Sequence, residues 1–175
     1  MRRADLEHII RAATSIANVY EIVVVGSQAV LGTFESAPAE LLQSMEADVY
    51  PLERPDLADL IDGSIGELSP FNMTYGYYAQ GVGPETAILP TGWQERLVKI
   101  QNANTDLKIG WCLEPHDLAV SKLAAGREKD WPYVRTLLDH QLIDENTLLA
   151  RIEQTPRIPA DRQAFLKRWV HSKRA

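Results

Sequence analysis

At 175 residues, with 45% hydrophobic and 24% charged residues, the chain has the size and composition of one globular domain, which excludes a disordered or fibrous protein. Its 24 acidic residues outnumber 18 basic ones, so nucleic acid could bind only at a local basic patch. The single cysteine, Cys112, excludes an internal disulfide and predicts an inert buried thiol. We find no signal peptide pattern and no apolar run long enough to span a membrane, and therefore expect a cytoplasmic protein without a membrane partner.

The first part of the chain predicts a sheet with covering helices. Apolar residues recur at helical spacing over residues 4–18, which predicts an amphipathic helix. The β-branched run at 21–25, which has no polar alternation, predicts a central strand buried on both faces. Further along we expect a strand at 45–50 and short helices at 28–31, 36–43 and 55–63.

The rest of the chain changes from irregular to helical character. Residues 63–86 are rich in glycine and tyrosine, and we expect a loop or short hairpin there, at the rim of a site. Strands are predicted at 87–89, 96–100 and 107–113, and helices at 115–125 and then from Asp130, from Asp144 and around Phe165. This order predicts an α+β fold, a mixed β-sheet flanked by helices and followed by a helical C-terminal part. We assign residues 1–140 to one α+β domain and residues 141–175 to helices packed on that domain.

Two short motifs could carry chemistry. Gly26-Ser27 follows the predicted central strand and leads into a helix, where backbone N–H groups and a hydroxyl can hold a phosphate, although the same dipeptide makes ordinary turns. Glu46 and Asp48 are two residues apart on a strand, so their carboxylates share one face. Their repulsion is relieved either by a divalent cation such as Mg²⁺ or by water at the wet face of an edge strand. From these residues alone, both interpretations stay open.

A Gly-Ser at the end of one strand and an acid-x-acid pair on the next resembles the nucleotidyltransferase superfamily. In that superfamily the serine and backbone hold the nucleotide phosphates, and the acids bind the metal. Over about residues 20–140 the chain also resembles a family of short bacterial proteins that is grouped with AbiEii-type nucleotidyltransferase toxins. The segments that carry this resemblance are GSQAVLG, SMEADVYP, PFNMTYGYYAQGVGPETAILPTGW and EPHDLAVSKLAAGREKDWPYVRTLL.

The resemblance to AbiEii-type proteins implies further site residues. By position, Lys122 on a helix and Asp130 at the end of a basic segment complete the site. Lys122, with Arg127, would bring positive charge to the nucleotide phosphates, and Asp130 would orient the lysine or act as a base. Each also has a structural interpretation: Asp130 as a helix N-cap, Lys122 as a solvated helix residue and Arg127 as a favourable charge at a helix C-terminus. His116 and Asp117 are interpreted as capping residues in preference to an acid–base pair.

Two departures from the superfamily pattern bear on catalysis. Glu46 stands where aspartate is usual, which moves the carboxylate by about a bond length, and no third strand carboxylate is evident. The segment Ala87–Leu89, where the pattern predicts that acid, is apolar, and Glu85 is the nearest candidate.

Two functions follow from the resemblance. The first is a metal-dependent nucleotidyltransferase that uses Mg²⁺ or Mn²⁺ to move a nucleoside monophosphate from an NTP to a hydroxyl of RNA, such as tRNA, or of a protein. Such an enzyme could be the toxin of a toxin–antitoxin or defence system, with a cognate antitoxin as partner. The alternative is a catalytically degenerate fold that binds a nucleotide or a protein. The basic residues near the C-terminus would contact RNA or form a solvated helix: Arg162, Lys167, Arg168, Lys173 and Arg174.

Overall fold

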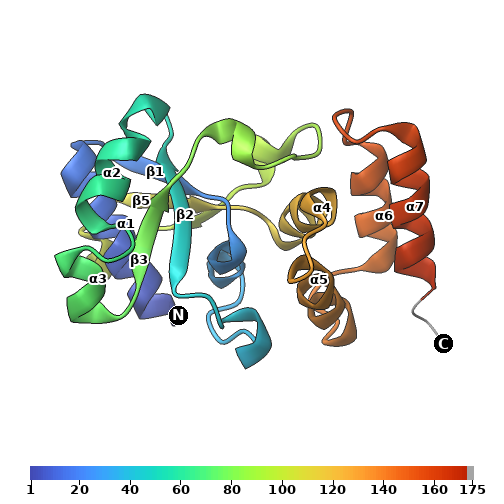
Figure 1. Cartoon of the computed structure of the whole chain (residues 1–175), viewed down its shortest axis with the longest axis horizontal. Coiled ribbons are helices and arrows are strands. Elements are labelled where there is room, and N and C mark those ends of the chain that lie inside the picture. The colour runs from blue at the N-terminus through green and yellow to red at the C-terminus, as the bar shows by residue number, and fades with distance from the viewer. Residues whose placement is uncertain (173–175) are drawn as a thin grey trace. The chain divides into compact units, whose positions relative to one another are not determined.

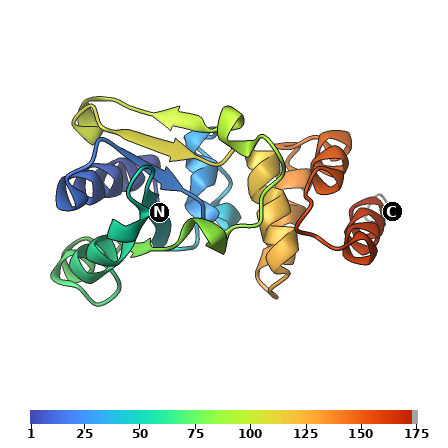
Figure 2. The ribbon, with the colours of Figure 1, turned by 90° about the horizontal axis from the view of Figure 1, so that it is seen from above.

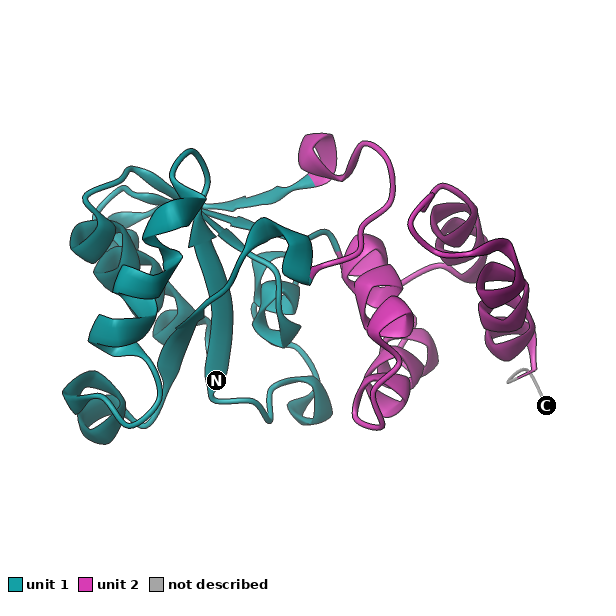
Figure 3. Cartoon of the chain, turned by 45° about the horizontal axis from the view of Figure 1, so that its top comes forward, with its two compact units in different colours: residues 1–86, 97–114 teal, residues 87–96, 115–175 magenta. Residues whose placement is uncertain are grey.

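The protein is described by a computed structural model, which places residues 1–172. The chain forms two compact units, which are considered separately (Figure 3). Unit 1 comprises residues 1–86 and 97–114, and unit 2 comprises residues 87–96 and the chain from Pro115 onward. The predicted division at residue 140 concerns folding domains rather than these units, and it stays a prediction.

Unit 1 is built on a five-stranded mixed sheet in the order β3-β2-β1-β5-β4 (Figure 1). The central strand β1 is antiparallel to β2 and parallel to β5, while β3 runs parallel to β2 and β4 antiparallel to β5. No side chain from Ile22 to Val24 is exposed, which confirms the prediction of a central strand buried on both faces. The strands are β1 (Glu21–Val24), β2 (Glu46–Pro51), β3 (Tyr78–Gly81), β4 (Val98–Ile100) and β5 (Ile109–Cys112).

Helix α1 (Arg3–Ala17) packs against this sheet through the apolar stripe that the sequence predicted. The β4–β5 hairpin, visible in Figure 2, turns through η6 (Ala103–Thr105), where residues 106 and 107 both have positive φ. The buried carboxylate of Glu7 on α1 accepts hydrogen bonds from the side-chain amides of Asn102 and Asn104, each at 2.8 Å. Helix α1 therefore contacts both the sheet and the turn of the β4–β5 hairpin.

Unit 1 contains 3-10 helices in the regions where short helices were predicted. Of the short helices predicted after β1, the structure forms η1 (Ser27–Gly32) and η2 (Ala39–Leu41). The helix predicted from Pro55 begins as η3 (Pro55–Leu57) and continues as α2 (Ala58–Ile65). Thus Gly63 lies inside α2 instead of ending it.

The prediction of a loop or short hairpin at 63–86 is wrong for much of this segment, which contains α3 (Pro70–Tyr75) and the edge strand β3. Ser69 caps α3 by accepting a hydrogen bond from the Asn72 backbone, and Gly76 ends it in a left-handed conformation. The strand predicted at 87–89 is also wrong: these residues follow η4 (Pro84–Thr86) without regular structure. A short apolar run does not distinguish a strand from another buried segment.

Unit 2 consists of helices and the segment 87–96, which includes η5 (Trp93–Arg96). Thr91 in this segment donates from its backbone to the carbonyl of Gln154 at 2.9 Å, which ties the segment to the end of α6. Asp144 caps α6 as predicted, by accepting a hydrogen bond from the Thr147 backbone. Within residues 115–172, the helices are α4 (Pro115–Ala125), α5 (Asp130–Asp139), α6 (Glu145–Glu153) and α7 (Ala160–His171).

The mixed sheet with flanking helices and C-terminal helices confirms the predicted α+β class. Aromatic and arginine side chains bridge α5 and α7: Trp131 lies 5.0 Å from Trp169 between ring centroids, and the Arg135 guanidinium lies over the Trp169 ring.

Among residues 1–172, no helix is both long and apolar enough to cross a membrane. Lys173 and Arg174, named above as basic residues near the C-terminus, lie outside the described residues.

Candidate functional site

The turn from β1 into η1 brings Gly26 against the neighbouring strand. Val25 donates from its backbone to the carbonyl of Asp48 at 3.0 Å, and η1 begins directly afterwards at Ser27. Gly26 is extended, with φ −83° and ψ −168°, a conformation open to any residue. Glycine is needed at this position because of the space available: a β-carbon here would overlap the Asp48 carboxylate. The Gly-Ser turn and one acid of the predicted pair are thus in direct contact.

Glu46 and Asp48 lie on the same face of β2, as the sequence predicted. Both are half-buried, whereas the intervening Ala47 and the following Val49 are completely buried. A β-carbon on Gly81, which pairs with Val49, would collide with the backbone of α2, so Val49 and its alternating neighbours face that helix. The two carboxylates therefore point to the opposite face of the sheet.

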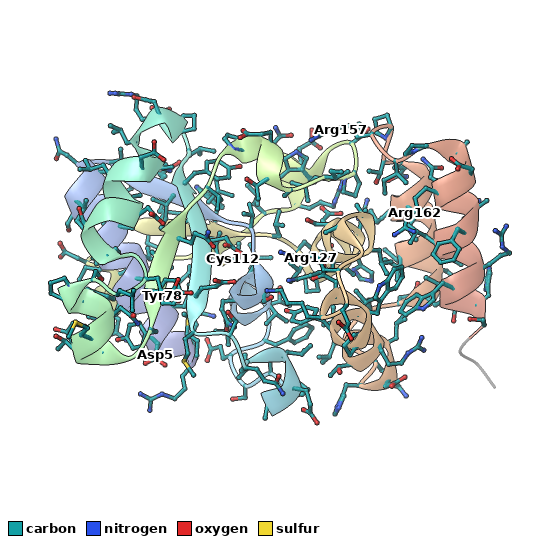
Figure 4. All side chains as sticks on the ribbon, in the orientation of Figure 1. Asp5, Tyr78, Cys112, Arg127, Arg157 and Arg162 are labelled. Carbon is teal, nitrogen blue, oxygen red and sulfur yellow. The ribbon has the colours of Figure 1, made fainter. Side chains whose placement is uncertain are left out.

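Strand β3 adds two side chains to this face that sequence reasoning missed. Tyr78 pairs with Glu46, and Gln80 pairs with Asp48. The Tyr78 hydroxyl donates a hydrogen bond to Glu46 Oε2 at 3.1 Å (Tyr78 is labelled in Figure 4). Burial, assisted by this hydrogen bond and by the charge of Glu46, raises the pKa of Tyr78 to about 12, so the hydroxyl stays protonated at neutral pH. The signal available in the sequence was the alternation of Tyr78 and Gln80 with small residues.

Glu46 and Asp48 are the residues of this face that could hold a hard divalent cation. Mg²⁺ is commonly held by one or two protein carboxylates and completes its coordination with phosphate oxygens and water. The close approach of Asp48 to Gly26 leaves this carboxylate beside the turn that would hold a phosphate. Within residues 1–172, no cluster of three or more His, Cys, Asp or Glu side chains is arranged for a metal, so the candidate is a site of two carboxylates.

Segment 87–89, the expected place of a third acid, forms no strand. Strand β2 lies between β3 and β1, and the β3 residue that pairs with Asp48 is Gln80, which is exposed. Glu85 lies in η4, outside the strands. Gln80 carries no charge and cannot take a proton from an acceptor hydroxyl as a carboxylate would.

Unit 2 contains the second group of predicted residues, clustered around Asp130. Lys122 Nζ on α4 lies 3.4 Å from Asp130 Oδ1, and Arg127 Nε lies 2.9 Å from Asp130 Oδ2. The Arg127 backbone N–H also donates to Asp130 Oδ2 at 3.1 Å. The side chains of Lys122 and Asp130 are only 7% and 1% exposed, so the interpretation of Lys122 as a solvated residue is wrong. The N-cap position of α5 belongs to Lys129, which corrects the N-cap interpretation of Asp130.

The charges around Asp130 determine its protonation. Burial would raise the pKa of Asp130, but the hydrogen bond from Arg127 and the positive charges of Lys122 and Arg127 outweigh burial and hold this pKa below its ordinary value. Asp130 is therefore anionic at neutral pH and a weak base. Of the two roles considered for it, orientation of Lys122 agrees better with this charge state than proton abstraction does.

Asp117 forms ion pairs with two arginines of unit 2, and its capping of α4 stays a prediction. Its buried carboxylate accepts two hydrogen bonds from Arg96, from Nε to Oδ2 at 2.8 Å and from Nη2 to Oδ1 at 3.1 Å. Arg151 Nε lies 3.4 Å from Asp117 Oδ1. Asp117 thus joins α4 to segment 87–96 and to α6 within unit 2. The neighbouring His116 accepts a hydrogen bond from the Asp144 backbone through Nε2 at 2.8 Å.

The predicted site residues thus form two groups: Gly26, Ser27, Glu46 and Asp48 in unit 1, and Lys122, Arg127 and Asp130 in unit 2. No curated protein and no solved structure matches the chain. One family model, described as a nucleotidyltransferase of unknown function (DUF6036), matches residues 4–174. That match spans nearly the whole chain and includes both groups of residues. The chain therefore belongs to this family of nucleotidyltransferases.

Proposed function

We propose that the protein is a metal-dependent nucleotidyltransferase, which moves a nucleoside monophosphate from an NTP to an acceptor hydroxyl. The observation that carries this proposal is the placement of the Asp48 carboxylate against Gly26, with Glu46 on the same face of β2. Glu46 and Asp48 would hold one or two Mg²⁺ or Mn²⁺ ions. Gly26 and Ser27 would hold the nucleotide phosphates through backbone N–H groups and the serine hydroxyl.

In this reaction, an acceptor oxygen forms a bond to the α-phosphorus of the NTP while the bond from that phosphorus to the β-phosphate oxygen breaks. The acceptor loses its proton, and pyrophosphate leaves. A bound divalent ion supplies charge stabilisation for the attacking and leaving oxygens. The turn at Gly26-Ser27 would orient the phosphates, and the carboxylates would fix the metal relative to that turn.

For unit 2, we propose that Lys122 and Arg127 supply positive charge to the β- and γ-phosphates and that Asp130 orients Lys122. The support is the resemblance to AbiEii-type proteins and the arrangement of charges around Asp130. A buried lysine held by a carboxylate is a fixed point charge, which suits stabilisation of charge developing on pyrophosphate.

We propose RNA, such as tRNA, as the acceptor, in preference to a protein. The net charge of −6 is divided unequally: unit 1 carries 15 acidic and six basic residues, whereas unit 2 carries nine acidic and 12 basic residues. Three of those basic residues, Arg162, Lys167 and Arg168, lie on α7. An excess of positive charge in one unit supports binding of a polyanion despite the negative total. A toxin role and a cognate antitoxin complete the proposal by family resemblance, and the cytoplasmic location is proposed from the sequence pattern alone.

The test is transfer of label from each of four NTPs carrying radioactive α-phosphate to total RNA, with Mg²⁺ or Mn²⁺. We expect transfer by the wild type and a loss of at least about a hundredfold in Asp48→Asn, which keeps the shape but removes the charge. Asp59→Asn is the matched control, because Asp59 is an exposed acid on α2. Equal transfer by the wild type and Asp48→Asn would contradict the proposal.

The second candidate function is a nucleotide-binding module without catalysis. The observation that favours it is Gln80, which stands opposite Asp48 without the charge of a third acid. This candidate predicts that the wild type binds NTP with Mg²⁺, measured by equilibrium dialysis, yet transfers no label to RNA or to protein. Transfer that depends on Asp48 would exclude it.

A further inference from the structure

The glutamate that departs from the superfamily pattern has a hydrogen-bonding partner on the adjacent strand. The Tyr78 hydroxyl donates to Glu46 Oε2 at 3.1 Å, and the two residues are directly paired in the parallel register of β2 and β3. We propose that Tyr78 is a positioning residue, which holds the Glu46 carboxylate in place for the divalent cation. This inference rests on the proposed function of the carboxylate pair and assigns a new residue to that site.

The chemistry of glutamate explains why such a partner is needed. Glutamate has one more rotatable bond than aspartate, so fixing its carboxylate at a metal costs more conformational entropy. A hydrogen bond to one carboxylate oxygen restricts these rotations in advance. Because tyrosine contributes no charge in its protonated form, it orients the carboxylate without competing with the metal as a cation would.

The backbone of Glu46 is held by separate contacts, so Tyr78 acts on the side chain. The Glu46 N–H donates to Ser44 Oγ at 3.2 Å, and the Ser44 carbonyl accepts from Gln28 Nε2 at 3.1 Å. Gln28 is completely buried on η1, one residue after Ser27. The start of β2 is thus tied to the Gly-Ser turn, while the end of the Glu46 side chain is tied to β3.

The chain supplies a matched control in the preceding residue. The Tyr77 hydroxyl forms a hydrogen bond of 2.8 Å with His8 Nδ1, and its ring packs with those of Phe71 and Tyr75. Tyr77→Phe therefore removes the same hydroxyl from the same segment without touching Glu46. A difference between the two tyrosine variants reports on the contact with Glu46 specifically.

The experiment measures Mn²⁺ affinity by electron paramagnetic resonance of the free ion, in the presence of an NTP analogue with a methylene bridge between the α- and β-phosphorus atoms. Tyr78→Phe should weaken Mn²⁺ binding about tenfold, as expected for loss of an outer-shell partner of a metal ligand. Tyr77→Phe should leave it unchanged. In a Glu46→Asp background, the shorter side chain should no longer depend on Tyr78, so adding Tyr78→Phe should have little further effect.

A second measurement uses the wild-type protein and is independent of whether a variant folds. With ¹³Cζ-labelled tyrosine, Mg²⁺ plus the same analogue should shift the Tyr78 resonance and leave the Tyr77 resonance in place. Equal Mn²⁺ affinity in the wild type and Tyr78→Phe, or an unmoved Tyr78 resonance with metal bound, would overturn the positioning role alone. If the wild type binds no Mn²⁺, the metal assignment of Glu46 and Asp48 fails together with it.

Discussion

The carboxylate of Asp48 occupies the space that a β-carbon at Gly26 would need. Since the backbone of Gly26 is extended, glycine is required there for packing rather than for conformation. This contact joins the turn after the central strand to the strand that carries the acid pair. It is the relationship on which the candidate site depends.

Gly26→Ala should therefore damage both stability and function. The added methyl group must displace the Asp48 side chain or the turn, and overpacking of this kind typically costs about 1–3 kcal/mol. Gly63→Ala is the control, because a β-carbon there meets nothing and Gly63 lies inside α2. It should raise the free energy of unfolding by about 0.5–1 kcal/mol. Urea denaturation of both variants measures these free energies. Equal shifts of the two unfolding midpoints would contradict the prediction.

Asp117→Ala should destabilise unit 2 strongly. Arg96 and Arg151 both form ion pairs with this buried carboxylate, and the substitution removes both pairs. Removing one partner of a buried ion pair lowers the free energy of unfolding by about 3 kcal/mol. Lys167→Ala removes the more exposed ion pair with Glu153 and should cost less than about 1 kcal/mol. Both free energies of unfolding follow from denaturant titrations. Similar values for the two variants would show that the Asp117 contacts contribute little.

The stability supplied by Asp130 should depend on pH in one direction. Its pKa is lower in the folded protein than in the unfolded chain, so the stabilisation is complete above the unfolded value of about 3.9 and disappears as pH falls through the folded value. Asp130→Asn mimics the protonated group. The difference in unfolding free energy between wild type and this variant should be constant above about pH 5 and should shrink below about pH 4. If the difference in unfolding free energy grew on acidification, that result would contradict the ion pairs of Asp130 with Lys122 and Arg127.

The thiol of Cys112 should be unreactive in the folded protein. Cys112, labelled in Figure 4, lies on β5. It is completely buried, and burial raises the pKa of its thiol to about 12. A disulfide reagent such as dithionitrobenzoate at pH 8 should label no thiol in the native state and one thiol per chain in urea. Labelling of the native protein at the rate of a free cysteine would place this strand at the surface.

Local sequence patterns predicted the elements whose burial is simple. The β-branched run of β1 indicated a strand covered on both faces, and the helical spacing of apolar residues indicated α1. Edge strand β3 was missed because its four residues alternate only weakly and sit between glycines. Its pairing with β2 is parallel and joins residues 32 positions apart, so no local pattern encodes it.

The α+β class and the placement of Glu46 and Asp48 on one face could be predicted from the residues, and the candidate roles of Lys122 and Asp130 from family resemblance. Strand alternation fixes which neighbours share a face, and that rule needs no tertiary contact. Three contacts could be seen only in the folded chain: Asp48 against Gly26, the hydrogen bond from Tyr78 to Glu46, and the ion pairs of Asp117 with two arginines. These contacts join residues distant in the chain, and their geometry depends on strand register and helix packing rather than on spacing along the sequence.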